Sequence, residues 1–129
     1  MLTAMKLTDE KIPGLNLVTA YSASEVRVGE KVLQRSCLLT AQQVISDFRP
    51  QTLEELTVSD LEAVFALEPE IVVIGSGPRQ HFPDSSLIGA VLSRGIGCEV
   101  MDTGAACRTY NVLVSEDRRV VAALFLRDH

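Results

Sequence analysis

The chain has 129 residues and a mass of 14.0 kDa, with 47% hydrophobic and 22% charged residues. This composition is typical of a globular protein with one hydrophobic core, and it excludes a disordered chain. The formal net charge of −5 argues against nucleic acid as a partner, because phosphates are neutralised by a basic surface. We expect a single domain over residues 1–129, with an irregular lead-in over 1–14 and a flexible end over 127–129.

The cysteine content bears on cellular location. The three cysteines, Cys37, Cys98 and Cys107, are odd in number, and no two of them have CxxC spacing. This pattern does not fit a disulfide framework or a zinc ribbon, so it favours reduced thiols in a cytoplasmic protein. No apolar stretch approaches the length of about 20 residues that a transmembrane helix needs. The early acidic residues Asp9 and Glu10 do not fit a signal peptide.

Short β-rich segments fill the first part of the chain. Residues 15–22 alternate loosely between apolar and polar and predict a strand. Alternation on both sides of Gly29 predicts a hairpin with its turn near Val28–Glu30. Two further strands are expected, over residues 31–40 and 42–49.

The second half of the chain alternates helices with strands. Helical spacing of apolar residues predicts three helices. The first spans residues 57–67 with Ser59 or Asp60 as N-cap, the second runs from Asp84 as N-cap to a stop at Gly95, and the third begins with Asp102 or Thr103 as N-cap. Apolar runs predict three strands, over residues 71–74, 98–101 and 119–126. The run over 71–74 is uninterrupted, which is typical of a strand buried on both faces. The alternation predicts an α/β fold with a mainly parallel or mixed sheet.

Four segments of this half resemble a known family of small domains. They are IVVIGSG (71–77), LSRGIGCEVMDT (92–103), ACRTYN (106–111) and the closing apolar strand (120–126). The family includes the mitochondrial respiratory complex I assembly factor 3, the adipogenesis-associated domain protein of animals, and many short bacterial and archaeal proteins. The resemblance implies a three-layer fold with a central mixed β-sheet, helices on it and additional N-terminal strands, and it implies no reaction. Since no mitochondrial transit segment is visible, we expect a bacterial stand-alone member.

The strands expected over 71–74 and 98–101 both end in small, flexible sequences. If the two strands are neighbours, their ends open at the same edge of the sheet, where ligands bind in open α/β folds. Glycines there either let the backbone approach a ligand or serve only as turn residues. The candidate ligand-binding pocket consists of Gly75, Ser76, Gly77, Arg79, Asp102, Thr103, Cys107 and Asn111. In this hypothesis Arg79 holds a small organic anion.

No motif for catalysis, metal or cofactor binding is complete. GSG lacks the GxGxxG spacing of dinucleotide sites, no Gly-Lys-Ser/Thr follows it, and no His/Asp/Glu cluster has metal-ligand spacing, so no cofactor is expected. Cys107 could form a Cys-His-Asp arrangement with His81 and Asp102, but a buried thiol and a helix-capping aspartate are the favoured interpretations. Thr103, Cys107 and Asn111 are spaced i, i+4 and i+8, and this polar stripe either ties the helix to the sheet or lines a pocket.

Two functions remain open. The first is a non-catalytic interaction or assembly-type accessory domain, which should present an exposed apolar patch or an edge strand to a protein partner. The alternative is a small-molecule-binding protein or minor enzyme that uses a crevice at Gly75–Arg79 and Asp102–Cys107. A homodimer is the default expectation for self-association.

Overall fold

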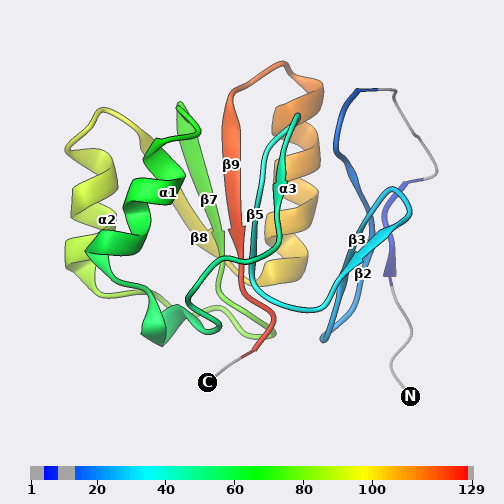
Figure 1. Cartoon of the computed structure of the whole chain (residues 1–129), viewed down its shortest axis with the longest axis horizontal. Helices are drawn as coiled ribbons and strands as arrows, with labels where there is room; N and C mark the ends of the chain where they lie inside the picture. Colours follow the sequence, from blue (N-terminus) through cyan, green and yellow to red (C-terminus); the bar gives the residue numbers. More distant parts are fainter. Residues whose placement is uncertain (1–4, 9–13, 128–129) are drawn as a thin grey trace.

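The computed structural model describes residues 5–8 and 14–127 and contains two β-sheets and three α-helices (Figure 1). The smaller sheet is antiparallel and has the strand order β1-β2-β3-β4. Its strands are Met5–Lys6 (β1), Val18–Tyr21 (β2), Val26–Val28 (β3) and Lys31–Leu33 (β4). The predicted hairpin is confirmed, since β3 and β4 are joined through Gly29, whose φ of 61° suits glycine.

The larger sheet is mixed and has the strand order β6-β5-β9-β7-β8. Its strands are Cys37–Leu39 (β5), Val44–Ile45 (β6), Ile71–Gly75 (β7), Gly97–Met101 (β8) and Val120–Leu124 (β9). β7 is parallel to β8 and β9, whereas β5 is antiparallel to β9 and β6. The uninterrupted apolar sequence of β7 fits this position, because a central parallel strand is covered on both faces.

Helices lie on both faces of the larger sheet. The α-helices are α1 (Leu61–Phe65), α2 (Ser85–Leu92) and α3 (Thr103–Ser115). Two short 3-10 helices come before α1 in the chain, η1 (Leu53–Glu55) and η2 (Val58–Asp60). α1 and α2 cover one face, and α3 and the smaller sheet cover the other (Figure 1). The structure confirms the predicted α/β class, with a central mixed sheet, helices on it and additional N-terminal strands.

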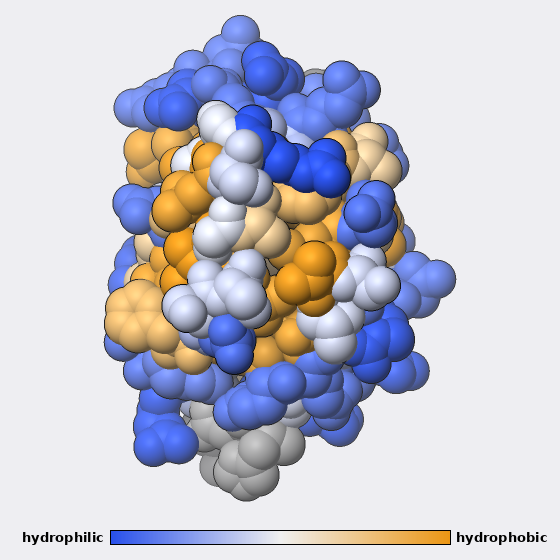
Figure 2. All heavy atoms as spheres, turned by 90° about the vertical axis from the view of Figure 1, so that its left-hand side faces the viewer, coloured by the Kyte–Doolittle hydropathy of each residue, from blue (hydrophilic) through white to orange (hydrophobic). Residues whose placement is uncertain are grey.

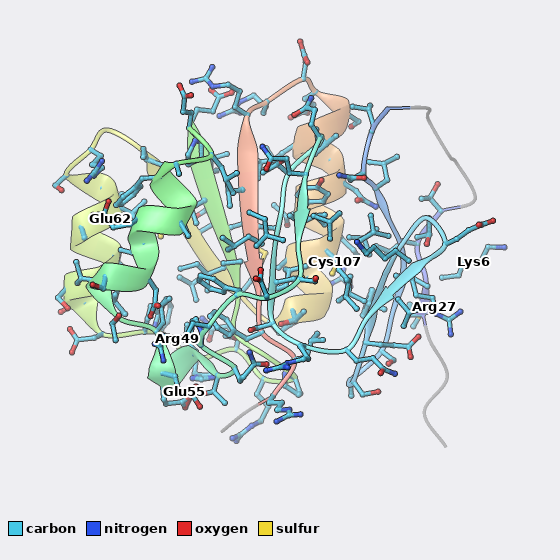
Figure 3. The ribbon with its side chains drawn as sticks, viewed as in Figure 1. Lys6, Arg27, Arg49, Glu55, Glu62 and Cys107 are labelled. Carbon is cyan, nitrogen blue, oxygen red and sulfur yellow. The ribbon has the colours of Figure 1, made fainter. Side chains whose placement is uncertain are left out.

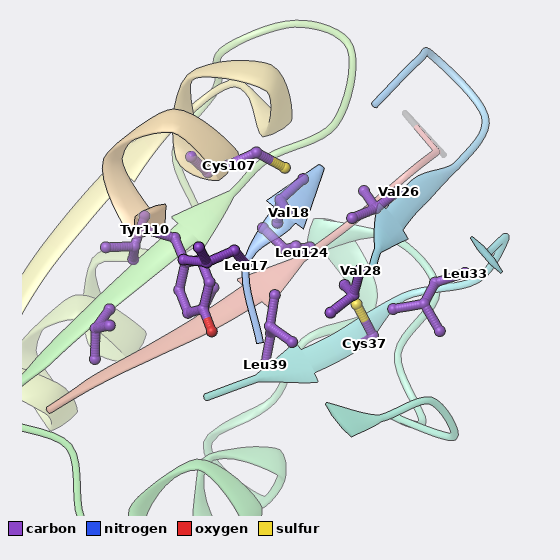
Figure 4. Close-up of a cluster of buried hydrophobic side chains, with 14 of the residues drawn as sticks. Leu17, Val18, Val26, Val28, Leu33, Cys37, Leu39, Cys107, Tyr110 and Leu124 are labelled. Atoms are coloured by element: carbon purple, nitrogen blue, oxygen red, sulfur yellow. The ribbon is translucent and has the colours of Figure 1, made fainter. Parts of the chain in front are cut away.

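Alternate residues of the larger sheet enter two separate hydrophobic cores. In β9, Val121 and Ala123 pack on the side of α1 and α2, whereas Ala122 and Leu124 pack on the side of α3 and the smaller sheet. Figure 4 shows the second core, where Tyr110 of α3 lies among aliphatic side chains from both sheets. Because successive side chains of a strand point to opposite faces, one apolar strand supplies both cores.

The strand predicted over residues 31–40 is wrong, because β4 and β5 are separate and belong to different sheets. Ser36 lies between them and is buried, and its hydroxyl is within hydrogen-bonding distance of the carbonyl oxygens of Phe48 and Pro50. These contacts hold the chain where it passes from one sheet to the other. The strand predicted over 42–49 is reduced to the two residues of β6.

The ends of the chain depart from the expected irregular segments where they are described. Part of the lead-in forms β1, which pairs with β2. Residues 1–4, 9–13 and 128–129 lie outside the described residues. The expected flexible end is described only at Arg127, which forms a parallel β-bridge with Thr52.

The helix predicted over residues 57–67 is shorter than expected, and its N-cap differs. η2 leads directly into α1, which ends at Phe65. The capping side chain is that of Thr57 and not that of Ser59 or Asp60. Thr57 accepts a hydrogen bond from the Asp60 backbone N–H, and the Asp60 carboxylate accepts one from the Thr57 N–H. This reciprocal pair is a capping box, which satisfies two backbone donors at the start of the helical segment.

The same capping box makes stability depend on pH in acid. Hydrogen bonds from Arg49, and then from Thr57, lower the pKa of Asp60 from 3.8 to about 2. Since the folded pKa is the lower one, the stabilisation is present above about pH 4 and is lost as the pH falls towards 2. We expect Asp60→Asn to lower the free energy of unfolding by about 1 kcal/mol at pH 7, because the Arg49 partner is solvent-exposed.

Urea denaturation of both proteins between pH 7 and pH 2 measures this difference. The gap between wild type and Asp60→Asn should close as the pH approaches 2, whereas Glu62→Gln on the exposed side of α1 should show no such convergence. A gap that is constant across this range would contradict the assignment.

Candidate functional site

The carboxyl ends of β7 and β8 lie side by side, which meets the condition set for the candidate pocket. The two strands pair in parallel, with Gly75 opposite Met101. Beyond the strands, the Ser76 N–H donates to the Met101 carbonyl at 2.8 Å, and the Thr103 N–H donates to the Gly77 carbonyl at 2.9 Å. α3 begins at this edge of the sheet.

Asp102 caps α3, which confirms one of its two predicted cap residues. Its Oδ1 accepts a hydrogen bond from the Ala105 N–H at 2.9 Å. A carboxylate at this position also interacts favourably with the helix dipole. Asp102 is therefore a structural residue whatever else it contacts.

Thr103 links the ends of three strands. Its Oγ1 accepts a hydrogen bond from the Gly77 N–H at 2.9 Å and donates one to the Phe125 carbonyl at 2.5 Å, and all of these groups are buried. Gly75 lies directly beneath it, where a Cβ would be 3.0 Å from the Thr103 Cα. Gly77 has a φ of 116°, a conformation that L side chains rarely adopt. The two glycines thus serve close packing and backbone geometry.

A surface hollow of about 320 Å³ opens beside these strand ends. It is lined by residues from both sheets and from the start of α3, namely Met5, Tyr21, Ser22, Ala23, Gly77, Pro78, Asp102, Thr103, Gly104, Phe125 and Leu126. Of the predicted pocket residues, Gly77, Asp102 and Thr103 line this hollow. Its walls are mainly apolar. The Phe125 side chain packs against Phe48 in the core on the side of α1 and α2, so Tyr21 is the lining aromatic residue outside that core.

Tyr21 and Phe125 are lining residues that the sequence did not indicate. They come from β2 and from the end of β9, which are distant in sequence from the GSG segment. Gly104 at the start of α3 packs closely on Tyr21, since an added Cβ there would lie 2.6 Å from the Tyr21 ring. Arg108 on the next turn of α3 donates to the Tyr21 hydroxyl and fixes the ring there.

Ser76 and Arg79 lie in the loop after β7 and do not line the hollow. Ser76 is buried, and its hydroxyl donates to the Arg79 carbonyl at 2.7 Å and accepts from the His81 N–H at 3.3 Å. The Ser76 hydroxyl therefore holds the loop in place through hydrogen bonds to the backbone of Arg79 and His81. The Arg79 side chain is exposed and is not among the residues that line the hollow.

Cys107 lies in the core between α3 and the smaller sheet (Figures 3 and 4). Burial raises the pKa of its thiol to about 12, so the thiol stays protonated at neutral pH. His81 is on the other side of the larger sheet, where it lines a small hollow with Leu53 and Leu87, and its Nε2 lies 2.9 Å from the Ser76 carbonyl. The structure thus separates the residues of the sketched Cys-His-Asp arrangement.

The burial of the cysteines predicts their order of alkylation. Cys37 and Cys107 are buried, whereas Cys98 on β8 is partly exposed. With iodoacetamide at pH 8, we expect peptide mass spectrometry to find modified Cys98 in the native protein and modified Cys37 and Cys107 only after unfolding in urea. Native-state alkylation of Cys107 as fast as that of Cys98 would show that the thiol is accessible.

Asn111 fastens β2 to α3. Its Nδ2 donates to the Val18 carbonyl at 2.8 Å, and its Oδ1 accepts from the Val18 N–H at 2.9 Å. On the preceding residue, the Tyr110 hydroxyl donates to the Asn16 carbonyl at 2.6 Å. Asn111 also lines a separate apolar hollow of about 370 Å³ beside Leu15. Two residues of the polar stripe, Thr103 and Asn111, therefore tie α3 to neighbouring segments, and each of them also lines a hollow.

The surface over α1 and α2 is apolar at its centre. Figure 2 shows hydrophobic and weakly polar side chains gathered in the middle of this face and hydrophilic residues around them. Its large exposed apolar side chains include Val58 (53% exposed), Phe82 (66%) and Leu92 (53%). β8, which packs against α2, is an edge strand of the larger sheet. An apolar patch and an edge strand are the two features expected of an interaction domain.

The described residues contain neither a cluster of metal-binding side chains nor a membrane-spanning helix. Within residues 5–8 and 14–127, no group of three or more His, Cys, Asp or Glu side chains is placed to hold a metal ion. In the same part of the chain, no helix has both the length and the apolar character needed to cross a bilayer.

The larger sheet, with helices on one face and a helix and a second sheet on the other, defines a fold shared with solved structures. The NMR structure of a protein from Xanthomonas campestris has a TM-score of 0.82 and 36% sequence identity, and the match covers 96% of this chain and 94% of that one. The chain belongs to the family described as "Protein of unknown function (DUF498/DUF598)", which matches residues 18–125. This confirms the family resemblance noted in the sequence.

Two curated relatives carry names that bear on function. The chain is 32% identical over 124 residues to the NADH dehydrogenase (ubiquinone) 1 alpha subcomplex assembly factor 3 of Bos taurus, a match that covers 95% of this chain and 67% of the relative. It is 29% identical over 117 residues to the "13 kDa major membrane protein" of Francisella tularensis, a match that covers 90% of this chain and 95% of the relative.

Proposed function

We propose that this protein is a non-catalytic accessory domain that binds a protein partner during the assembly of a larger complex. The observation that carries the proposal is the similarity to the bovine assembly factor, which extends over 95% of this chain. Shared fold and sequence over this length support a shared mode of action, although a fold alone does not imply a function. The cytoplasmic location expected from the cysteines stays a prediction.

The chemistry of the strand ends supports binding over catalysis. The polar side chains here form hydrogen bonds with the backbone, as those of Ser76, Thr103 and Asn111 do. The Asp102 carboxylate caps a helix. Cys107 is a buried, protonated thiol. A nucleophile or general base needs an accessible group with a matched pKa. In this proposal the hollow near Tyr21 takes up an apolar side chain of the partner.

A second candidate function is the binding of a small molecule in the same hollow. Its volume of about 320 Å³ and its mainly apolar walls favour this use, because small-molecule sites are concave and largely apolar. The candidate ligand is apolar and not the anion first considered, since Arg79 does not line the hollow. Native mass spectrometry of protein from its own host tests this candidate, and a retained small mass would support it.

The assembly proposal is tested in the host by deleting the gene and separating native complexes by size, with mass spectrometry of each fraction. We expect one multisubunit complex to decrease, its sub-assembly to accumulate, and wild-type expression to reverse both changes. NADH dehydrogenase is the first complex to examine, because of the bovine relative's name. Unchanged complexes, together with migration of this chain at its own 14.0 kDa, would overturn the proposal.

A further inference from the structure

One side of the β8 backbone is not covered by any other strand of the described residues. The Gly97 N–H donates to the Glu70 carbonyl, and the Met101 carbonyl accepts from the Ser76 N–H, so these residues point their backbone groups towards β7. Backbone groups alternate in direction along a strand, and Glu99 therefore also points towards β7. The N–H and C=O groups of Cys98 and Val100 point the other way, out of the sheet.

These outward groups are unpaired within the described part of the chain. β8 pairs only with β7, and no turn or side chain between residues 14 and 127 bonds to the Cys98 or Val100 backbone. An extended segment can bind such an edge through main-chain hydrogen bonds and so add a strand to the sheet.

The side chains of β8 indicate which kinds of side chain an added strand would have. Cys98 and Val100 pack on the side of α2 and are partly exposed. The outer surface of α2 carries no charge, because Ser85–Leu92 contains no acidic or basic residue. Leu92, the last residue of α2, is half exposed. Apolar side chains of an added strand would be covered on this side.

The opposite side of β8 carries one acidic side chain, that of Glu99. Glu99 is exposed, and its carboxylate forms no ion pair or hydrogen bond with residues 5–8 or 14–127. Gly97, on the same side, presents no side chain. A basic residue placed across from Glu99 would form a favourable cross-strand pair.

We propose that the free edge of β8 binds an extended segment of the partner protein, with apolar residues facing α2 and a basic residue facing Glu99. The segment becomes a sixth strand of the larger sheet. This inference rests on the proposed function, because it names a contact surface for the same partner in addition to the hollow near Tyr21.

A second copy of the chain fits this edge less well. Antiparallel pairing that engages Cys98 and Val100 of both copies is centred on Glu99, and it places the two Glu99 carboxylates directly opposite each other. Each copy also carries a net charge of −5. Charge complementarity therefore favours a different, basic segment.

The test uses a capped seven-residue peptide in which lysine alternates with threonine or valine. NMR spectra of the full protein measure amide hydrogen exchange with and without the peptide. Saturating peptide should slow amide hydrogen exchange at Cys98 and Val100 by about tenfold or more, because these amides gain hydrogen bonds. Peptide N-methylated along the edge that faces β8 should not bind. The same number of N-methyl groups on the other edge should leave binding unchanged.

Charge reversal tests the role of Glu99. Glu99→Lys should weaken binding of the lysine peptide about fivefold at low salt and strengthen binding of the matching glutamate peptide by a similar factor. Glu116→Lys, which makes the same change at the exposed end of α3, should leave both affinities unchanged.

Three results would overturn the inference. They are no binding at millimolar peptide, binding without protection at Cys98 and Val100, and protection that appears without peptide as the chain dimerises in sedimentation experiments. The last would assign the edge to a second copy. None of these results affects the gene-deletion test, so failure of this inference is distinguishable from failure of the proposed function.

Discussion

Replacing Thr103 with valine is expected to lower the free energy of unfolding by about 2–4 kcal/mol, measured by urea denaturation. Valine keeps the shape of the side chain but removes the hydroxyl that joins the Gly77 N–H to the Phe125 carbonyl. Both groups are buried, and each would lose its hydrogen-bond partner at a cost of about 1–3 kcal/mol. The substitution thus measures how strongly this one hydroxyl holds β7, β9 and α3 together.

Two matched variants separate the hydroxyl from other effects. Thr103→Ser keeps the hydroxyl and loses one methyl group, so we expect a loss of about 1 kcal/mol. Thr109→Val makes the valine change two turns along α3, where the hydroxyl contacts only the Met101 sulfur at 3.3 Å, and its effect should be below about 0.5 kcal/mol. Equal losses in the two valine variants would contradict the assigned role of Thr103.

Replacing Gly75 with alanine is expected to cost about 2–3 kcal/mol through overpacking. An added Cβ would lie 2.9 Å from the Thr103 Oγ1, 3.0 Å from its Cα and 3.1 Å from the Ala106 Cβ. The first turn of α3 cannot move away easily, because its hydrogen bonds to the strand ends would lengthen. Thermal unfolding followed by circular dichroism measures the loss.

Gly89→Ala is the matched control for Gly75→Ala. Gly89 lies in α2, and an added Cβ there has no neighbour within 4 Å. Alanine should therefore stabilise the protein by about 0.5–1 kcal/mol, because it favours the helix. A Gly75→Ala protein as stable as the wild type would show that α3 does not pack so closely on β7 that a Cβ is excluded.

The sequence predicted best those features that depend on neighbouring residues. Asp84 and Asp102 were expected to cap helices and do so, because an aspartate binds backbone N–H groups two or three residues further on. The apolar run 71–74 was expected to be a strand buried on both faces, and it is a strand that pairs on both sides and supplies both cores. The same reasoning failed over 31–40, where one β-rich run is divided between two sheets. Local propensity does not show which strand will be the partner.

The same distinction between local sequence and distant packing applies to the residues of the candidate pocket. Gly77, Asp102 and Thr103 line the hollow, because the sequence placed them at the ends of strands that proved to be neighbours. Cys107, one helical turn further on, is in the core instead. The spacing i, i+4 puts residues on one helix face but does not say whether that face meets solvent or a sheet. Tyr21 on the pocket wall could not be foreseen, since it comes from the other sheet.

The sequence by itself determined the α/β class, the order of helices and strands in the second half, and the family. These follow from short-range hydrogen bonding, from the period of the apolar residues, and from motifs that are contiguous in the chain. Only the tertiary structure decided the division into two sheets, the burial of Cys107, the walls of the hollow and the open edge of β8. Each of these depends on which distant segments pack together, and that is set by the burial of whole apolar faces against one another.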